Sequence, residues 1–113
     1  MTSKDRLIVV QQNFIHFVEK RQIIYCQSDN CYTSIYLTDG KILLLVKSLA
    51  KVMREDLNSV DFIRISQSYL INKNYIKIIN KKKKLIELLN EHSVPFTVTL
   101  KELMELLSHP VTI

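Results

Sequence analysis

Glycine and proline are nearly absent from this chain of 113 residues: Gly40 is the only glycine, and Pro95 and Pro110 are the only prolines. One glycine is too few for the glycine-rich loops that hold phosphate groups in nucleotide-binding proteins. The turns must therefore depend mainly on Asn, Asp and Ser, whose short polar side chains hydrogen-bond the neighbouring backbone.

Cysteine and long apolar runs are also scarce. Cys26 and Cys31 are the only cysteines, and without another Cys or His at finger spacing they do not make a zinc site. In a reducing cytosol we expect free thiols, with Cys26 acting as a small buried hydrophobe. The polar first residues do not make a signal peptide, and no segment approaches the roughly 18 apolar residues of a membrane span. We therefore expect a cytoplasmic protein that needs no metal or other cofactor.

Groups of residues typical of catalysis are missing from the sequence as well. His16, His92 and His109 lie far apart, and none stands beside a Ser, Cys or carboxylate in a known catalytic arrangement. Catalysis needs such groups in mutual contact. We therefore do not expect an enzyme.

Positive charge is plentiful. The net charge is +5 and the isoelectric point is about 9.3, which favours polyanionic partners such as DNA, RNA or an anionic membrane. Six lysines and no acidic residue lie in a short segment, at Lys73, Lys77, Lys81, Lys82, Lys83 and Lys84. These lysines fit two interpretations: a solvated turn that discourages pairing of sheet edges, or a surface that attracts phosphates.

Short segments rich in Ile, Val, Phe and Tyr dominate the chain and predict β-strands. We expect strands at Leu7–Val10, Phe14–Val18, Ile23–Gln27, Tyr32–Leu37, Lys41–Val46, Phe62–Ser66, Tyr69–Ile71, Tyr75–Ile79, Lys84–Leu89 and Val94–Thr97. Ser48 caps an expected mid-chain helix, and Thr99 with Glu102 forms a capping box for a C-terminal helix that ends at His109-Pro110. Consecutive strands favour antiparallel pairing. The sequence thus predicts one mostly β domain over residues 1–113, with one mid-chain and one C-terminal helix.

The segment from Phe62 to Asn72 is the most informative part of the chain. Ile63, Ile65, Tyr69 and Ile71 alternate with polar residues, which predicts extended chain with one buried face and puts Asn72 on the polar face. This segment places polar side chains on an extended backbone, and the lysine-rich segment follows it directly. Together they favour a protein that recognises nucleic acid.

The order of these motifs resembles that of the LytTR domain, a mostly β DNA-binding output module of many bacterial response regulators. The resemblance runs from about residue 14 to residue 107. Ile23–Tyr32 is similar to the first family signature, Ser48-Leu49 opens the expected helix, Phe62–Asn72 is similar to the most diagnostic stretch, and Val94–Thr97 precedes the final helix. The resemblance implies double-stranded DNA as the partner, a role in transcription regulation related to two-component systems, and pairing of two copies on repeated sites. It covers an output module alone, so we expect a regulator without its own receiver domain, controlled by its expression level or by a regulatory protein partner.

The departures from the family pattern fall on the residues that reach DNA in the family. Ser66-Gln67 replace His followed by a basic or Asn residue, and Thr97-Val98-Thr99 replace Ser-Arg-Arg. Cys31 replaces the Asn of an Asn-Tyr loop, and Gln27 replaces a Glu. Losing a guanidinium removes a contact to guanine or phosphate worth about 1–3 kcal/mol.

We interpret two sets of residues as DNA contacts. The base-edge candidates, on the loops that the resemblance points to, are Asn30, Ser66, Gln67 and Thr99. The phosphate candidates are Arg64, Lys73, Lys77, Lys81, Lys82, Lys83 and Lys84. Arg64 fits a structural ion pair equally well.

Two rival functions stay open. A protein-interaction module could keep the fold and lose specific DNA reading, and its partner binding would be insensitive to salt. Docking on an anionic membrane would need an exposed apolar face beside the lysines, for which Ile78 and Ile79 are the available residues. We expect no membrane binding.

Overall fold

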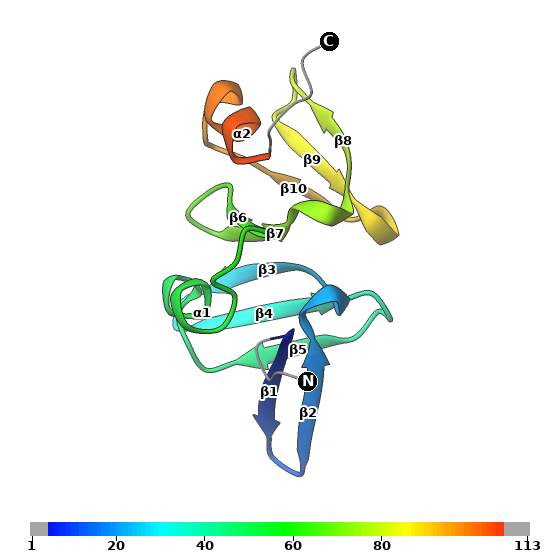
Figure 1. Cartoon of the computed structure of the whole chain (residues 1–113), viewed down its shortest axis with the longest axis vertical. Coiled ribbons are helices and arrows are strands. Elements are labelled where there is room, and N and C mark those ends of the chain that lie inside the picture. Colours follow the sequence, from blue (N-terminus) through cyan, green and yellow to red (C-terminus); the bar gives the residue numbers. More distant parts are fainter. Residues whose placement is uncertain (1–4, 108–113) are drawn as a thin grey trace.

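The computed structural model describes residues 5–107, which form three antiparallel sheets arranged along the long axis of the molecule (Figure 1). At one end, β1 (Arg6–Gln11) and β2 (Phe14–Glu19) form a protruding hairpin. The middle layer is a five-stranded sheet in the order β5-β4-β3-β7-β6. Its strands are β3 (Ile23–Asp29), β4 (Tyr32–Leu37), β5 (Ile42–Leu45), β6 (Phe62–Arg64) and β7 (Tyr69–Asn72).

The other end of the molecule holds the third sheet and the C-terminal helix (Figure 1). This sheet has the order β10-β9-β8, with β8 (Ile76–Asn80), β9 (Leu85–Leu88) and β10 (Ser93–Pro95). Two helices complete the fold, α1 (Leu49–Glu55) and α2 (Leu100–Leu107). Short 3-10 turns link strands at η2 (Lys20–Gln22), η3 (Lys73–Tyr75) and η4 (Leu89–Glu91). The expected fold class, mostly antiparallel β with two helices, is confirmed.

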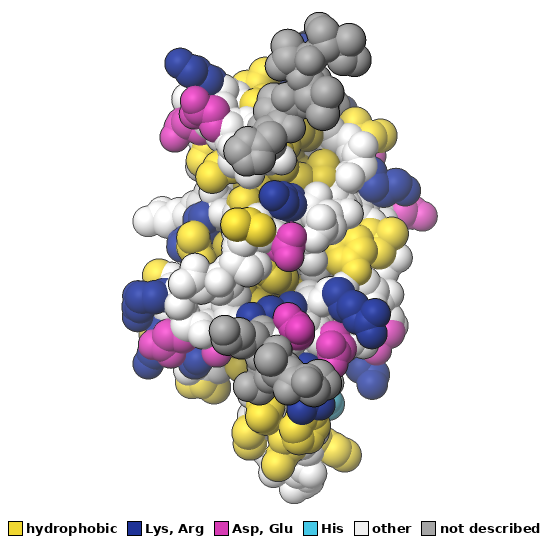
Figure 2. All heavy atoms as spheres, in the orientation of Figure 1, with side chains coloured by type: hydrophobic (Ala, Val, Ile, Leu, Met, Phe, Trp, Pro, Cys, Tyr) yellow, Lys and Arg dark blue, Asp and Glu magenta, His cyan; other side chains and the backbone are white. Residues whose placement is uncertain are grey.

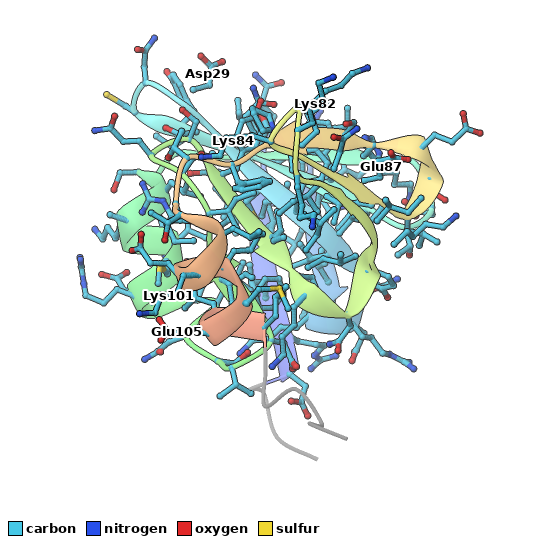
Figure 3. All side chains as sticks on the ribbon, turned by 90° about the horizontal axis from the view of Figure 1, so that it is seen from above. Asp29, Lys82, Lys84, Glu87, Lys101 and Glu105 are labelled. Atoms are coloured by element: carbon cyan, nitrogen blue, oxygen red, sulfur yellow. The ribbon has the colours of Figure 1, made fainter. Side chains whose placement is uncertain are left out.

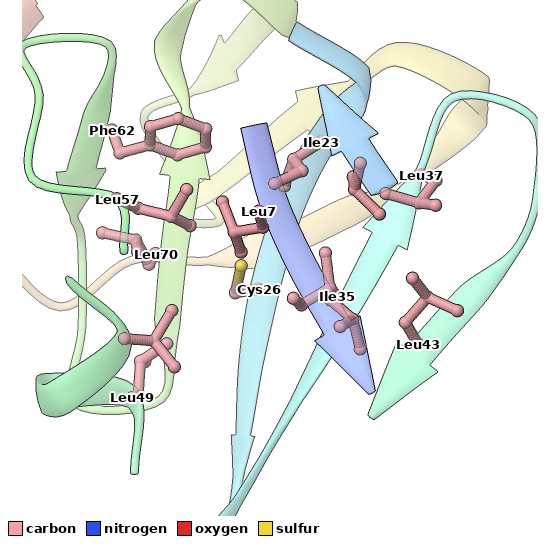
Figure 4. Packing of buried hydrophobic residues seen from close by; sticks show 13 residues of the cluster. Leu7, Ile23, Cys26, Ile35, Leu37, Leu43, Leu49, Leu57, Phe62 and Leu70 are labelled. Atoms are coloured by element: carbon pink, nitrogen blue, oxygen red, sulfur yellow. The ribbon is translucent and has the colours of Figure 1, made fainter. Parts of the chain in front are cut away.

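The five-stranded sheet buries side chains on both of its faces, so the protein has two cores. On one face, Leu7 of the hairpin, Ile35 of the sheet and Leu49 of α1 belong to the same cluster (Figure 4). On the other face, Ile24 and Ile71 pack with residues of the third sheet and with Leu103 of α2. Burial of apolar surface on both sides holds the three layers together.

These two cores correct the expectation for Phe62–Asn72. The segment is a hairpin of β6 and β7 in the middle layer, and it is buried on both faces rather than one. Ile63 and Ile71 face the second core, while Phe62 and Leu70 face the first. Asn72 is only 2% exposed, so it does not lie on a polar face. Period-two alternation was misleading here because a central layer has no solvent face.

The local signals for turns and caps are confirmed. Gly40 has φ +91°, and Asn30 and Asn90 take the left-handed conformation that glycine would otherwise supply. Ser48 caps α1 by accepting a hydrogen bond from the Lys51 backbone N–H at 3.2 Å. Leu85–Leu88 is a strand, within the expected Lys84–Leu89. The expected helix end at His109-Pro110 lies outside the described residues.

Several strands are shorter or longer than the sequence indicated. β6 ends at Arg64 and β10 ends at Pro95, so Ser66 and Thr97 lie in loops instead of strands. Cys26 is fully buried, as expected, and Cys31 is exposed. Within residues 5–107, no helix is both long enough and apolar enough to cross a membrane.

Candidate nucleic-acid interface

Three loops meet along one side of the molecule, at the left of Figure 1. They are the β3–β4 turn (29–32), the β6–β7 loop (65–68) and the β10–α2 loop (96–99); together we call them the three-loop edge. The Ser28 backbone N–H donates to the Ser68 carbonyl oxygen at 2.8 Å. The backbone N–H groups of Thr97 and Val98 both donate to the Ile65 carbonyl oxygen, at 2.9 and 3.3 Å. Segments 32 to 40 residues apart in sequence are thus joined into one surface.

The β6–β7 loop is held in a defined shape by its own side chains. The Ser66 hydroxyl oxygen accepts from the backbone N–H groups of Ser68 and Tyr69, at 3.2 and 3.1 Å. The Arg64 guanidinium donates to the carbonyl oxygens of Ser66 and Gln67, at 2.8 and 2.6 Å. Arg64 is therefore bonded to backbone carbonyls and makes no ion pair within the described residues.

Gln67 lies at the tip of this loop. Its side chain is exposed and makes no hydrogen bond with any residue between 5 and 107. The amide keeps both its donor and its acceptor for a ligand, which suits bidentate pairing with adenine. Ser66 differs, because its hydroxyl oxygen is already used inside the loop.

In the β10–α2 loop, one polar residue has a structural role and another is exposed and free to contact a ligand. The Thr99 hydroxyl accepts from the Glu102 backbone N–H at 3.0 Å, and the Thr99 N–H donates to the Glu102 carboxylate at 3.1 Å. These hydrogen bonds from Thr99 lower the pKa of Glu102. Val98 packs against the second core, whereas Thr97 is exposed. Thr97, which the expected strand Val94–Thr97 included, was not among the predicted base-edge contacts.

The β3–β4 turn supplies the third loop. Asn30 and Cys31 form its two-residue tip between the paired residues Asp29 and Tyr32, and both side chains of the tip are exposed. Gln27, by contrast, is held within the sheet, where its side-chain oxygen accepts from the Tyr36 hydroxyl at 3.2 Å. Asn30 is therefore the available polar side chain of this loop.

The lysines do not form a single patch. Lys81–Lys84 make up the exposed turn between β8 and β9, which we call the lysine turn. The Lys84 carbonyl accepts from the Phe96 N–H at 3.1 Å, and the Lys84 ammonium lies 5.5 Å from the centre of the Phe96 ring. The lysine turn is thereby tied to the start of the β10–α2 loop. Figure 3 shows Lys82 and Lys84 toward the same side of the molecule as Asp29.

Lys73 and Lys77 lie elsewhere. Lys73 follows the end of β7 that is opposite the β6–β7 loop, and its N–H donates to the Asp61 carbonyl oxygen at 2.8 Å. Lys77 is exposed in the middle of β8. Lys101, in the first turn of α2, is exposed two residues beyond Thr99. Lys101 was not among the predicted phosphate contacts.

A cleft of about 1060 Å³ lies away from the three-loop edge, between the base of the hairpin and the end of α1. Cations and a larger number of carboxylates line it together, which makes it a poor site for phosphate. Its charged residues are Asp5, Arg6, Glu19, Lys20, Arg21, Glu55, Asp56 and Asp61. No group of three or more His, Cys, Asp or Glu side chains among the described residues is arranged to hold a metal ion.

Comparison with known families identifies the fold. The family model described as the LytTr DNA-binding domain matches residues 13–109, which is most of the chain. The chain belongs to the LytTR family of DNA-binding domains. Membership of this family implies DNA binding in transcription regulation. No curated protein matches the sequence.

A solved LytTr DNA-binding domain of a response regulator from Bacillus cereus has the same fold as this LytTR domain. The two chains share 18% sequence identity, with a TM-score of 0.76 over 92% of this chain and 97% of the other. At this level of identity the likeness concerns the arrangement of sheets and helices.

Proposed function

We propose that this LytTR domain binds double-stranded DNA with sequence preference through its three-loop edge and acts as a transcription regulator. The observation that carries the proposal is the joining of three loops by backbone hydrogen bonds, with exposed polar side chains at their tips. Gln67 and Asn30 approach base edges, and Thr97 joins them. Ser66 and Thr99, which stand in the sequence positions expected of readers, keep one hydroxyl donor each while their oxygens hold the loops.

We assign the phosphate contacts to the lysine turn and to Lys101, which flank the β10–α2 loop. Ammonium groups that neutralise phosphates release counterions, so their contribution to affinity falls as salt rises. Lys73 and Lys77 lie away from the loops. Their charges therefore attract DNA over a distance instead of contacting its phosphates. Pairing of two copies on repeated sites is part of the same proposal.

The test is selection from a random duplex pool, followed by measurement of the selected duplex's affinity across salt concentrations. We expect an enriched motif and a steep fall of affinity with salt. Replacing Lys81–Lys84 by Ala should reduce the log–log salt slope by about 3 to 4, since each phosphate contact contributes about 0.9. Binding of all duplexes with equal affinity would remove sequence preference from the proposal.

Gln67→Ala tests the reading role directly. It should weaken binding to the selected motif by about 5- to 150-fold, which corresponds to the 1–3 kcal/mol of a good bidentate pair. Affinity for a scrambled duplex should stay unchanged. Gln12→Ala is the matched control, because Gln12 is an exposed glutamine in the turn of the distant hairpin. Equal effects of the two variants on the selected motif would contradict the reading role.

Two observations favour the alternative of a protein-interaction module. Val98 packs into the second core at a position where the family carries an arginine. The hydroxyl oxygens of two expected readers are already bonded, that of Ser66 inside the β6–β7 loop and that of Thr99 at the start of α2. If no duplex binds at low salt, the three-loop edge recognises a protein instead, and that binding should be insensitive to salt.

A further inference from the structure

Strand β5 is one open edge of the five-stranded sheet. The Leu37 N–H donates to the Lys41 carbonyl oxygen at 2.9 Å, which fixes the alternation of hydrogen bonds between β4 and β5. In this alternation the backbone N–H and C=O groups of Ile42 and Leu44 point away from β4. No residue between 5 and 107 bonds these backbone groups. Free backbone groups along an edge strand are a template for pairing with another extended chain.

Three other edge strands carry features that discourage such pairing. In the third sheet, Pro95 lies in β10 and Lys77 lies in the middle of β8, and both residue types protect edges in natural proteins. Strand β6, at the opposite edge of the five-stranded sheet, has only three residues. Strand β5 contains neither a charge nor a proline, and its side chains Ile42 and Leu44 are 58% and 44% exposed. It is therefore open to an added strand.

The β1–β2 hairpin crosses the strands of the five-stranded sheet and extends past β5 (Figures 1 and 4). Val9 is fully buried in the first core, whereas Phe14, near the tip of the hairpin, is 67% exposed. Phe14 pairs with Gln11, two residues beyond Val9, so Phe14 and Val9 share one side of the hairpin. Two strand residues span about 6.8 Å, and neighbouring strands of a sheet lie about 4.8 Å apart. The tip therefore overhangs the position of a sixth strand beside β5, and Figure 2 shows hydrophobic side chains at this end of the molecule.

We propose that an extended segment of an acidic partner protein pairs with β5 as a sixth strand, under the tip of the hairpin. We call this position the strand slot (Ile42, Leu44 and Phe14). Strand addition to an open edge is a common mode of peptide recognition, in which backbone hydrogen bonds supply affinity and alternate side chains supply specificity. In the strand slot, the backbone of β5 makes the hydrogen bonds and the Phe14 ring covers an apolar side chain of the segment. The proposal goes beyond the proposed function, because this contact does not involve DNA.

Charge favours an acidic segment as the occupant. Residues 41–54 contain four basic residues and no acidic residue. Lys41, at the start of β5, is exposed and makes no ion pair among residues 5–107, while Lys47, beyond its end, is bonded to Asp56 at 2.6 Å. The nearby Asp39 carboxylate is turned to the Lys41 backbone N–H at 2.9 Å. The net charge of +5 also attracts acidic proteins over a longer range.

The same charges disfavour a second copy of the chain in the strand slot. A two-fold antiparallel pairing of two β5 strands centred on Leu44 would place Lys41 of each copy opposite Lys47 of the other. Like charges that face each other across paired strands are destabilising. A partner segment with acidic residues at both ends avoids this repulsion.

The test measures binding of labelled synthetic peptides to the full chain by fluorescence anisotropy. The probe is a short peptide that alternates Val with Thr and carries Glu at both ends. It should bind saturably, and N-methyl groups on its central residues should weaken binding about tenfold or more, because they remove backbone donors and keep the side chains. The same peptide with Lys at both ends should also bind about tenfold more weakly at low salt. Equal binding of the three peptides, or binding of none, would overturn the proposal.

Protein variants locate the site. Phe14→Thr should weaken binding of the probe about fivefold or more, because the slot loses its aromatic cover. Phe17→Thr is the matched control: Phe17 is 56% exposed on the opposite side of the same hairpin, and its replacement should leave the affinity unchanged. Both side chains are largely exposed, so both variants should keep the native circular dichroism spectrum. Equal effects of the two variants on probe binding would contradict the strand slot.

A further variant and a further measurement separate the possible occupants. Leu44→Pro removes one outward backbone donor of β5 and should abolish probe binding. Sedimentation velocity without peptide should show a monomer at the concentrations of the binding assay. Association of the wild type that Leu44→Pro abolishes would make a second copy the occupant and overturn the acidic partner. None of these measurements uses DNA, so failure of the proposed function would leave their outcome unchanged.

Discussion

Arg64 provides a sharp test of the interface, because two roles for it predict different salt dependence. In the structure its guanidinium donates to two carbonyl oxygens of the β6–β7 loop, at 2.8 and 2.6 Å. We propose that Arg64 holds Gln67 in its binding position instead of contacting phosphate. Arg64→Met keeps the apolar stem and removes both hydrogen bonds.

The expected loss of DNA affinity follows from the free energy needed to order the β6–β7 loop on binding. Hydrogen bonds from a charged donor contribute about 1.5–3 kcal/mol when buried, and less at this partly exposed site. Without them, Ser66 and Gln67 must be ordered on binding, at about 1–2 kcal/mol for each residue's backbone. We take about 2 kcal/mol as the net loss, which corresponds to a roughly thirtyfold lower affinity for the selected motif.

The assay is fluorescence anisotropy of the selected duplex over a series of salt concentrations. Arg64→Met should lower affinity at every concentration and leave the log–log slope unchanged. Lys82→Met, in the lysine turn, is the control and should reduce the slope by about 0.9. If Arg64→Met also reduced the slope by about 0.9 and weakened scrambled duplexes equally, Arg64 would be a phosphate contact and the loop-holding role would be wrong.

Two further predictions concern buried groups. Asn72 donates to the Ile23 carbonyl oxygen and accepts from the Asn74 N–H, both at 3.0 Å, so Asn72→Ala should cost about 3 kcal/mol and lower Tm by at least about 10 °C in calorimetry. Asn74→Ala, which removes one exposed hydrogen bond to Asp61, should cost under about 1 kcal/mol, and equal losses would contradict this reasoning. Burial raises the pKa of the Cys26 thiol, so a thiol reagent should modify Cys31 quickly and Cys26 only after unfolding. Two fast-reacting thiols per folded chain would show that Cys26 is accessible.

The local features of this protein were predictable from the sequence because neighbouring residues decide them. The capping box of Thr99 and Glu102, the cap at Ser48 and the turn at Gly40 each depend on hydrogen bonds or dihedral angles within a few residues. The order of strands and the family resemblance follow from the same local patterns. They gave the fold class, and with it the expectation of DNA binding.

Whether a polar side chain is free to bond a ligand depends on contacts between segments that are distant in the sequence. Ser66 and Gln67 are adjacent polar residues in the sequence, yet only Gln67 is left without a partner among the described residues. Val98 turns into the second core because its backbone is held against Ile65, 33 residues earlier. Asn72 is buried because its strand lies between two other layers. A sequence pattern records the alternation of side chains along a strand, but only the stacking of the three sheets determines which faces water reaches.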